Sequence, residues 1–206
     1  MKTLLKLNSS IFGENGASSR LTDAFVGRWL AAHPGARVIE RNLATDPVPH
    51  LTADAFAGFN AQPGERSPAQ QAAVEVSDAL IDELERADVV VLGLPMYNFG
   101  VPSALKAYFD YIGRAGKTFR YTESGPEGLL TDKQAYIFAT RGGIYDGAPS
   151  ETETSYVRQF LSFLGITNIE FVYAEGLALG DAARAVAFES AARTIEQLTD
   201  ALQRVA

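Results

Sequence analysis

The sequence predicts an α/β protein in which a parallel β-sheet is covered by helices on both faces. Five short apolar segments with the character of strands alternate along the 206 residues with segments of helical periodicity. The segment Ala87–Gly93 has an unbroken aliphatic core, which is typical of a strand buried on both faces. No internal repeat interrupts the alternation, and the length fits a single domain over residues 1–206.

Composition narrows the class of protein further. Hydrophobic residues make up 47% of the chain, but no apolar run approaches the roughly twenty residues that span a bilayer, so we expect a soluble protein with no membrane partner. The amino end lacks the apolar stretch of a secretory signal, which predicts a cytoplasmic location. The absence of cysteine excludes disulfides and thiolate sites. A net charge of −7 argues against nucleic acid as a partner.

The chain begins with a strand, a helix and a second strand. The expected segments are a strand over residues 3–9, a turn-rich loop over 9–18, a helix from about Ser18 or Ser19 to His33-Pro34-Gly35, and a strand over 37–43. The apolar face of this helix comprises Leu21, Phe25, Trp29 and Leu30. Such a unit is almost always right-handed, which places the helix on one face of the sheet.

Residues 44–66 show no sustained period and contain several prolines and glycines. We expect a long loop here, with a helical turn near residues 52–59 as one option, and either a binding loop or a disordered segment fits this composition. A helix then begins at Ser67-Pro68-Ala69-Gln70, where a capping box and a proline at the first position coincide. The expected buried face of this helix comprises Ala73, Val76, Leu80, Leu84 and Ala87.

The strand 87–93 leads into a loop over residues 95–102 and then into a helix over residues 103–112. The buried face of that helix is expected to comprise Leu105, Tyr108, Phe109 and Ile112. An extended excursion follows over residues 114–126. It carries Phe119 and Tyr121, two aromatic residues that we expect to be exposed.

The last third of the chain repeats the alternation. The expected segments are a strand over residues 134–139, a loop over 140–145, a capping box at Ser150–Glu153, a helix ending at Gly165, a strand over 169–174 and a helix from about Asp181. The two helices are expected to bury Val157, Phe160, Leu161 and Leu164, and Phe188, Ala191, Ile195, Leu198, Leu202 and Val205. Five strands with this rhythm suit a doubly wound sheet of flavodoxin-like order 2-1-3-4-5.

Three loops therefore fall at the carboxyl ends of strands, where open α/β sheets bind their ligands. The first ends at a helix amino terminus, so the backbone of Ser10, Gly16, Ala17 and Ser18 can hold a phosphate. The alternative is that a serine merely caps the helix.

The second and third loops suit a flat ligand. Met96, Tyr97, Asn98 and Phe99 can stack on a ring and hydrogen-bond its edge, although these side chains could instead pack into the core. Asn98 either holds the polar edge of the ring or caps the following helix. Thr140, Arg141, Gly142 and Gly143 include adjacent glycines, which let backbone amides approach a planar ligand or simply form a flexible turn.

Other chemistries find little support. The sequence has only two histidines, His33 and His50, and they provide one weak candidate for the catalytic histidine of a Ser-His hydrolase. No histidine or carboxylate cluster has metal-ligand spacing, and no glycine-rich fingerprint for ATP or NAD occurs. Loops poor in acids and bases but rich in aromatic side chains and backbone amides favour a cofactor that carries its own reactivity.

Four motifs resemble the FMN-dependent NADH azoreductases, which are also NADH:quinone oxidoreductases. They are Pro95–Phe99, Tyr108–Asp110, Arg114–Glu123 with Gly125-Pro126, and Thr140–Gly143, and the resemblance covers nearly the whole chain. It implies that Ser10 and Gly16 to Ser18 bind the phosphate of FMN. It also implies that Met96 to Phe99 and Thr140 to Gly143 contact the isoalloxazine ring. No catalytic side chain is expected, since the flavin carries the chemistry.

The resemblance further implies that NADH gives a hydride to the flavin, which then reduces a quinone or an azo compound in the same site. It implies a homodimer with the flavin at the interface, so that Phe119 and Tyr121 are expected to bind substrate from the partner chain. Tyr145 is a third expected substrate residue, at a position where many relatives carry histidine. Gly16 and Ala17 also depart from many relatives, which carry a hydroxyl and an amide side chain there.

Two other functions compete with this interpretation. One is a flavodoxin-like electron carrier without substrate turnover, and the other is a flavin-free binding domain. The long loop over residues 44–66 and the excursion over residues 114–130 favour an enzyme, because a small carrier has little use for walls around its flavin.

Overall fold

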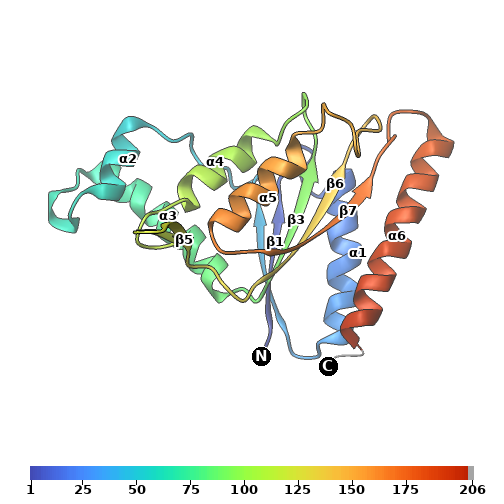
Figure 1. Ribbon diagram of the computed structural model, residues 1–206, viewed down its shortest axis with the longest axis horizontal. Coiled ribbons are helices and arrows are strands. Elements are labelled where there is room, and N and C mark those ends of the chain that lie inside the picture. The colour runs from blue at the N-terminus through green and yellow to red at the C-terminus, as the bar shows by residue number, and fades with distance from the viewer. Residues whose placement is uncertain (204–206) are drawn as a thin grey trace.

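Helices lie on both faces of a five-stranded parallel sheet (Figure 1) in a computed structural model that describes residues 1–203. The strand order is β2-β1-β3-β6-β7. This is the predicted order 2-1-3-4-5, because β4 and β5 form a separate hairpin. Two predicted members of the last helix face, the side chain of Leu202 and Val205, lie outside the described residues.

The elements follow the predicted segments closely. The strands of the main sheet are β1 (Thr3–Asn8), β2 (Arg37–Asn42), β3 (Val89–Pro95), β6 (Gln134–Thr140) and β7 (Asn168–Ala174). The helices are α1 (Ala17–Ala32), α2 (Ala53–Asn60), α3 (Pro68–Arg86), α4 (Ser103–Ile112), α5 (Glu153–Phe163) and α6 (Asp181–Gln203), with short 3-10 turns at Gly13–Asn15 and Pro63–Glu65. No helix within residues 1–203 is long and apolar enough to cross a membrane.

The central strand β3 is buried along its whole length, as its apolar sequence predicts. Successive side chains of a strand point to opposite faces, so β3 contributes to two separate cores. Val90 and Leu92 pack with α3, α4 and α5, whereas Val89 and Val91 pack with α1 and α6. Figure 1 shows the two groups of helices on either side of the sheet.

The two predicted capping boxes have different outcomes. At α3 the box is confirmed, since Gln70 N–H donates to Ser67 Oγ at 3.2 Å and Ser67 N–H donates to Gln70 Oε1 at 2.9 Å. At α5 the prediction is wrong, because Thr152 occupies the N-cap position without a side-chain bond and Ser150 is exposed. Glu153, the expected last residue of that box, is instead buried beside Arg141.

The segment 44–66 contains more structure than the sequence predicts. The option of a helical turn near residues 52–59 is realised as the two-turn helix α2, which begins with Thr52 Oγ1 accepting from Ala55 N–H at 3.1 Å. A side chain at Gly58 would overlap Gln70, so the two helices α2 and α3 are in close contact. On α3 the predicted burial of Val76 is wrong, and Val74 and Ile81 are buried in its face instead.

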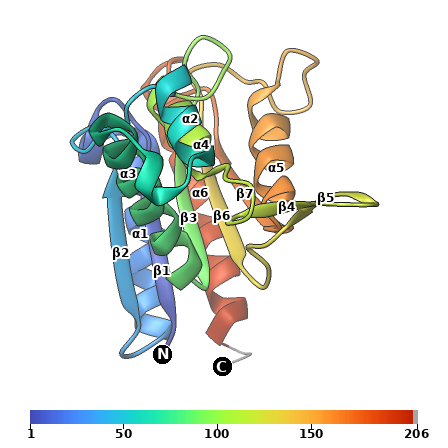
Figure 2. The same cartoon turned by 90° about the vertical axis from the view of Figure 1, so that its left-hand side faces the viewer.

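The excursion after α4 is an antiparallel hairpin of β4 (Phe119–Thr122) and β5 (Gly125–Gly128) that projects from the body of the molecule (Figure 2). The expected exposure is correct for Tyr121, which is 76% exposed, and wrong for Phe119. Phe119 is buried because its ring packs against Phe163 of α5, with the centroids 4.4 Å apart. The hairpin is therefore anchored by one aromatic residue and presents the other to solvent.

Candidate functional site

A pocket of about 260 Å³ lies at the carboxyl ends of β1, β3 and β6, where the three predicted loops meet. Sheets of this type bind ligands at this edge. The pocket takes residues from all three loops and from the segment after β7. Its lining comprises Ser10, Phe12, Asn15, Gly16, Ala17, Pro95, Met96, Tyr97, Thr140, Arg141, Gly142, Leu177 and Arg184.

The first loop supplies backbone donors at the amino end of α1. The first bond of the helix joins Arg20 N–H to Gly16 C=O at 3.1 Å, so the amides of residues 17–19 precede the helical ladder. These N–H groups and the positive end of the helix dipole favour an anion. Position 16 has no space for a side chain, because a Cβ there would come within 2.6 Å of Ser10 Cβ.

The side chains of this loop are tied to the second loop. Tyr97 accepts a hydrogen bond from Ile11 N–H at 3.3 Å, and its hydroxyl lies 3.3 Å from Ser10 Oγ. Ser18 is buried and its Oγ has no hydrogen-bond partner. That oxygen lies near Gly93 of β3, so the Ser18 side chain is directed at the sheet and does not line the pocket.

The second loop makes a tight turn at Asn98 and Phe99. Their φ angles are 51° and 64°, and Tyr97 and Gly100 exchange two backbone hydrogen bonds of 3.0 Å. This is the pattern of a type I′ turn, in which asparagine is favoured and a bulky residue is not. The alternative that Asn98 caps α4 is wrong, because α4 begins at Ser103 with Pro102 in the cap position.

Phe99 lies at the rim of the site. Its ring meets Tyr145 edge-on at a centroid distance of 5.8 Å, and 59% of the residue is exposed. Neither Asn98 nor Phe99 lines the 260 Å³ pocket, and Tyr145 also lies outside it. The three residues belong to the two loops, after β3 and β6, that supply Met96, Tyr97 and Gly142 to the pocket lining.

The third loop is held by the segment after β7. Leu177 N–H donates to Arg141 C=O at 3.1 Å and Gly176 N–H donates to Gly143 C=O at 2.8 Å. The amides of Gly142 and Gly143 have no acceptor within residues 1–203, so they are available to a ligand. Gly142 lines the pocket, whereas Gly143 lies behind the ring of Tyr145.

The side chain of Arg141 anchors this loop from inside the protein. It is buried among three carboxylates, at 2.7 Å from Glu151, 2.9 Å from Glu175 and 3.5 Å from Glu153. Burial raises the pKa of the Glu153 carboxyl to about 8, attraction to Arg141 opposes the shift, and repulsion from Glu151 adds to it. Glu175 also accepts the N–H of Tyr145 at 2.9 Å, so the network positions the whole loop.

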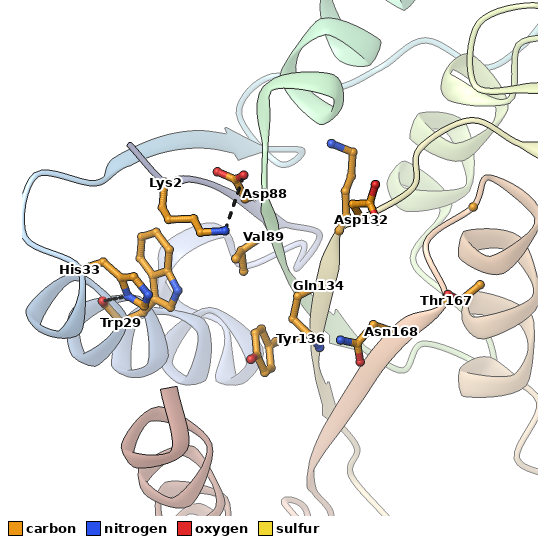
Figure 3. A pocket seen from close by; sticks show the side chains of 12 residues that line it. Lys2, Trp29, His33, Asp88, Val89, Asp132, Gln134, Tyr136, Thr167 and Asn168 are labelled. Carbon is orange, nitrogen blue, oxygen red and sulfur yellow. Dashed lines mark hydrogen bonds and ion pairs between the residues drawn. The ribbon is translucent and has the colours of Figure 1, made fainter. Parts of the chain in front are cut away.

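A larger pocket of about 500 Å³ lies at the opposite edge of the sheet (Figure 3). Its charged side chains bond within the chain. Asp88 accepts from Thr3 N–H at 2.8 Å and lies 3.9 Å from Lys2 Nζ, while Lys133 donates to Ala87 C=O at 2.7 Å. This pocket lies at the amino ends of the strands and contains none of the three loops, so the smaller pocket is the candidate site.

Comparison with known proteins identifies the family of this chain. A family model described as a flavodoxin-like fold matches residues 1–199. An FMN-dependent NADH:quinone oxidoreductase of Cellvibrio japonicus (strain Ueda107) is 52% identical over 197 residues, which cover 96% of this chain and 98% of that relative. The chain belongs to this oxidoreductase family. A relative of the same name in Burkholderia pseudomallei (strain K96243) is 48% identical over 195 residues, 95% of this chain and 98% of its own length.

Solved structures extend the family to azoreductases. An azoreductase from Bacillus anthracis str. Sterne has a TM-score of 0.86 and 31% identity and covers 99% of this chain and 100% of its own. An FMN-dependent NADH-azoreductase from Bacillus anthracis str. Ames Ancestor, solved in complex with FMN, has a TM-score of 0.89 and 26% identity, with 98% and 100% covered. The predicted resemblance to the FMN-dependent azoreductases and quinone oxidoreductases is confirmed.

The structure gathers most of the residues that the family resemblance indicates. In one pocket lie Ser10, Gly16, Ala17, Met96, Tyr97, Thr140, Arg141 and Gly142; next to it lie Ser18, Asn98, Phe99, Gly143 and Tyr145. Phe119 and Tyr121 belong to the hairpin and do not line the pocket of their own chain.

Sequence reasoning missed several members of the site. Leu177 and Arg184 follow β7, whose carboxyl end lies at the same edge as those of β1, β3 and β6. The predicted strand order contains that signal, because it places the loop after the last strand beside the loop 140–145. Glu151, Glu153 and Glu175 carry no such signal, since only the fold brings them to Arg141.

Proposed function

We propose that this protein binds FMN in the pocket at the carboxyl edge and uses NADH to reduce quinones and azo compounds. The main support is the combination of a helix amino end, a glycine backbone and an aromatic loop in one pocket, in a chain of the FMN-dependent oxidoreductase family. When bound, FMN supplies the redox chemistry by accepting a hydride from NADH and passing two electrons to the acceptor.

The residues of the pocket bind and orient the cofactor. The amides of residues 17–19 would hold the phosphate at the positive end of α1, next to Gly16 of the pocket lining. Met96, Tyr97 and the amide of Gly142 line the pocket and would hold the ring of the cofactor. Ser10 is held in place through the hydroxyl of Tyr97.

Substrates enter at the rim formed by Phe99 and Tyr145. These two rings stand edge to face beside the pocket, where they can contact a flat nicotinamide, quinone or azo compound. NADH and the acceptor would reach the cofactor through this one rim in turn, which would give a ping-pong mechanism.

A second copy of the chain would complete the site. Ile11, Phe12, Phe99 and Ile144 are exposed apolar residues in the loops around the pocket, and each is at least 59% exposed. Such residues favour an interface between copies. In a homodimer Tyr121 would reach the partner's site from the hairpin, while Phe119 would support it from behind, with the two rings 5.5 Å apart. A cytoplasmic location agrees with the use of NADH and is part of this proposal.

Two measurements test the proposal. The purified protein should show the absorption spectrum of a flavin and oxidise NADH rapidly only when a quinone or azo dye is added, with many turnovers per flavin. An electron carrier would stop after one equivalent of NADH, and a flavin-free binding domain would show no flavin spectrum. Initial-rate plots at several quinone concentrations should be parallel, and intersecting lines would reject the shared site.

A further inference from the structure

An arginine from α6 lies on the side of the pocket that the amino end of α1 forms. Arg184, the fourth residue of α6, lines the same pocket as Asn15, Gly16 and Ala17. The helices α1 and α6 lie side by side with their amino ends at the same edge of the sheet (Figure 1). Arg184 is therefore the basic side chain that the phosphate loop itself lacks.

The charge of Arg184 is not balanced within the described chain. No ion pair of residues 1–203 includes this arginine, and its one hydrogen bond is a 3.5 Å contact with Leu177 C=O. Its guanidinium stacks on Phe188 at 5.4 Å from the ring centroid. A cation near the amino ends of two helices is repelled by both dipoles, so an anion bound between them would relieve the repulsion.

We propose that Arg184 binds the phosphate of FMN together with the amino end of α1 and thereby makes the site selective for a phosphorylated flavin. A guanidinium offers several donors that match phosphate oxygens. Gly16 and Ala17 contribute no side-chain donor, and Arg184 supplies one from across the pocket. This inference rests on the proposed function, since it concerns the ligand of the same site.

Riboflavin separates the phosphate from the rest of the ligand. The apo-protein is titrated with FMN and with riboflavin, and binding is followed by flavin fluorescence. In Arg184→Gln the dissociation constant for FMN should rise about ten-fold or more, as expected for the loss of a charge-assisted hydrogen bond. The constant for riboflavin should stay within about two-fold, and Arg184→Lys should lie between Gln and wild type for FMN.

Arg20 provides a matched control. Its guanidinium stacks on the same Phe188 ring at 4.6 Å, but Arg20 is exposed and does not line the pocket. Arg20→Gln should leave both dissociation constants unchanged. Raising the salt concentration should weaken FMN binding more in the wild type than in Arg184→Gln, because the charge pair is screened.

Three outcomes would overturn the inference. Equal losses for FMN and riboflavin would assign Arg184 to packing on Phe188. Unchanged FMN binding with a raised KM for NADH would assign it to the phosphates of the nicotinamide nucleotide. Unchanged binding and kinetics would leave it without a role in the site. A wild type that binds neither flavin would instead reject the proposed function itself.

Discussion

At Gly16 the backbone has a φ of −64°, an angle open to every residue, so space and not conformation requires glycine. A Cβ would come within 2.6 Å of Ser10 Cβ and would displace the Ser10 side chain that contacts Tyr97. We expect Gly16→Ala to weaken FMN binding about ten-fold, since overpacking of this kind typically costs roughly 1–3 kcal/mol. Flavin fluorescence titration of the apo-protein measures the change.

Two variants control this prediction. Ser18→Ala should leave the FMN dissociation constant unchanged, because the Ser18 hydroxyl is buried toward Gly93 and not toward the pocket. In a Ser10→Gly background, Gly16→Ala should cost little further FMN affinity, since the atoms that the new methyl group meets are gone. If Gly16→Ala weakens FMN binding as much in that background as in the wild type, steric displacement of Ser10 is not the cause.

Two variants of Asn98 can separate a contact of its side chain with the flavin from the need for a positive φ in the turn. Its φ of 51° means that Asn98→Gly keeps the turn and removes only the amide, whereas Asn98→Leu also introduces left-handed strain of roughly 1–2 kcal/mol. If the amide binds the edge of the flavin, both variants lose about 0.5–1.5 kcal/mol of FMN binding, and only Asn98→Leu also melts earlier. Wild-type FMN affinity in Asn98→Gly would show that the residue serves the turn alone.

The loop after β6 is held by Arg141, which lies beside a buried carboxyl group with a raised pKa. Glu153 is buried beside Arg141, with Glu151 and Glu175 on the same guanidinium and Tyr173 over its face. Because folding raises the Glu153 pKa from 4.5 to about 8, the folded chain holds a proton that the unfolded chain releases between these values. The stability from this carboxyl is present below pH 4.5 and is lost as the pH rises through 8.

Glu153→Gln keeps the shape of the side chain and removes its titration. We expect the melting temperature of the wild type to fall relative to that of Glu153→Gln between about pH 5 and about pH 9, by an amount on the order of a few kcal/mol in unfolding free energy. Thermal melts of both proteins at matched pH values measure the difference. Parallel curves over this range would mean that Glu153 does not hold a proton in the folded protein.

Elements whose pattern is set by neighbours in sequence are predicted well. The buried strand 87–93, the face of α4 with Leu105 and Tyr108, and the capping box at Ser67 each depend on local periodicity or capping. The helix α2 is too short for periodicity to reveal, and tertiary contacts such as Phe59 against Tyr111 stabilise it.

The site residues that the sequence did not predict also depend on tertiary contacts between segments distant in sequence. The predicted capping box at Ser150 does not form, because Glu153 is instead buried with Arg141, which lies ten or more residues away in sequence. Arg184 enters the pocket only because α6 packs on α1. Loop positions at the carboxyl edge follow from the strand order, but the side chains that come from other elements do not.

The hairpin β4–β5 carries the exposed Tyr121, and we predict that it completes a site shared between two chains. Light scattering should give twice the mass of one chain. Tyr121→Ala should raise the KM for the quinone while FMN binding stays unchanged, because the exposed ring does not line the pocket of its own chain.

Mixed dimers identify the chain in which Tyr121 acts. Tyr121→Ala chains are mixed with an excess of chains whose pocket is blocked by Gly16→Leu, so most remaining flavin sites receive Tyr121 from a blocked partner. The KM for the quinone should then return toward the wild-type value. A KM that stays raised in the mixture would show that Tyr121 acts within its own chain or not at all.

The contact between α1 and α6 joins two helices that lie far apart in the sequence. Arg28 of α1 donates to Thr199 Oγ1 at 3.0 Å and pairs with Glu196 at 3.2 Å, and this packing brings Arg184 to the pocket. A ribosome delivers the phosphate loop well before α6. Tight FMN binding is thus expected only after α6 has been synthesised, which flavin fluorescence of nascent chains stalled before or after α6 can test. FMN should then load onto chains whose α6 has already packed on α1, and not onto shorter nascent chains.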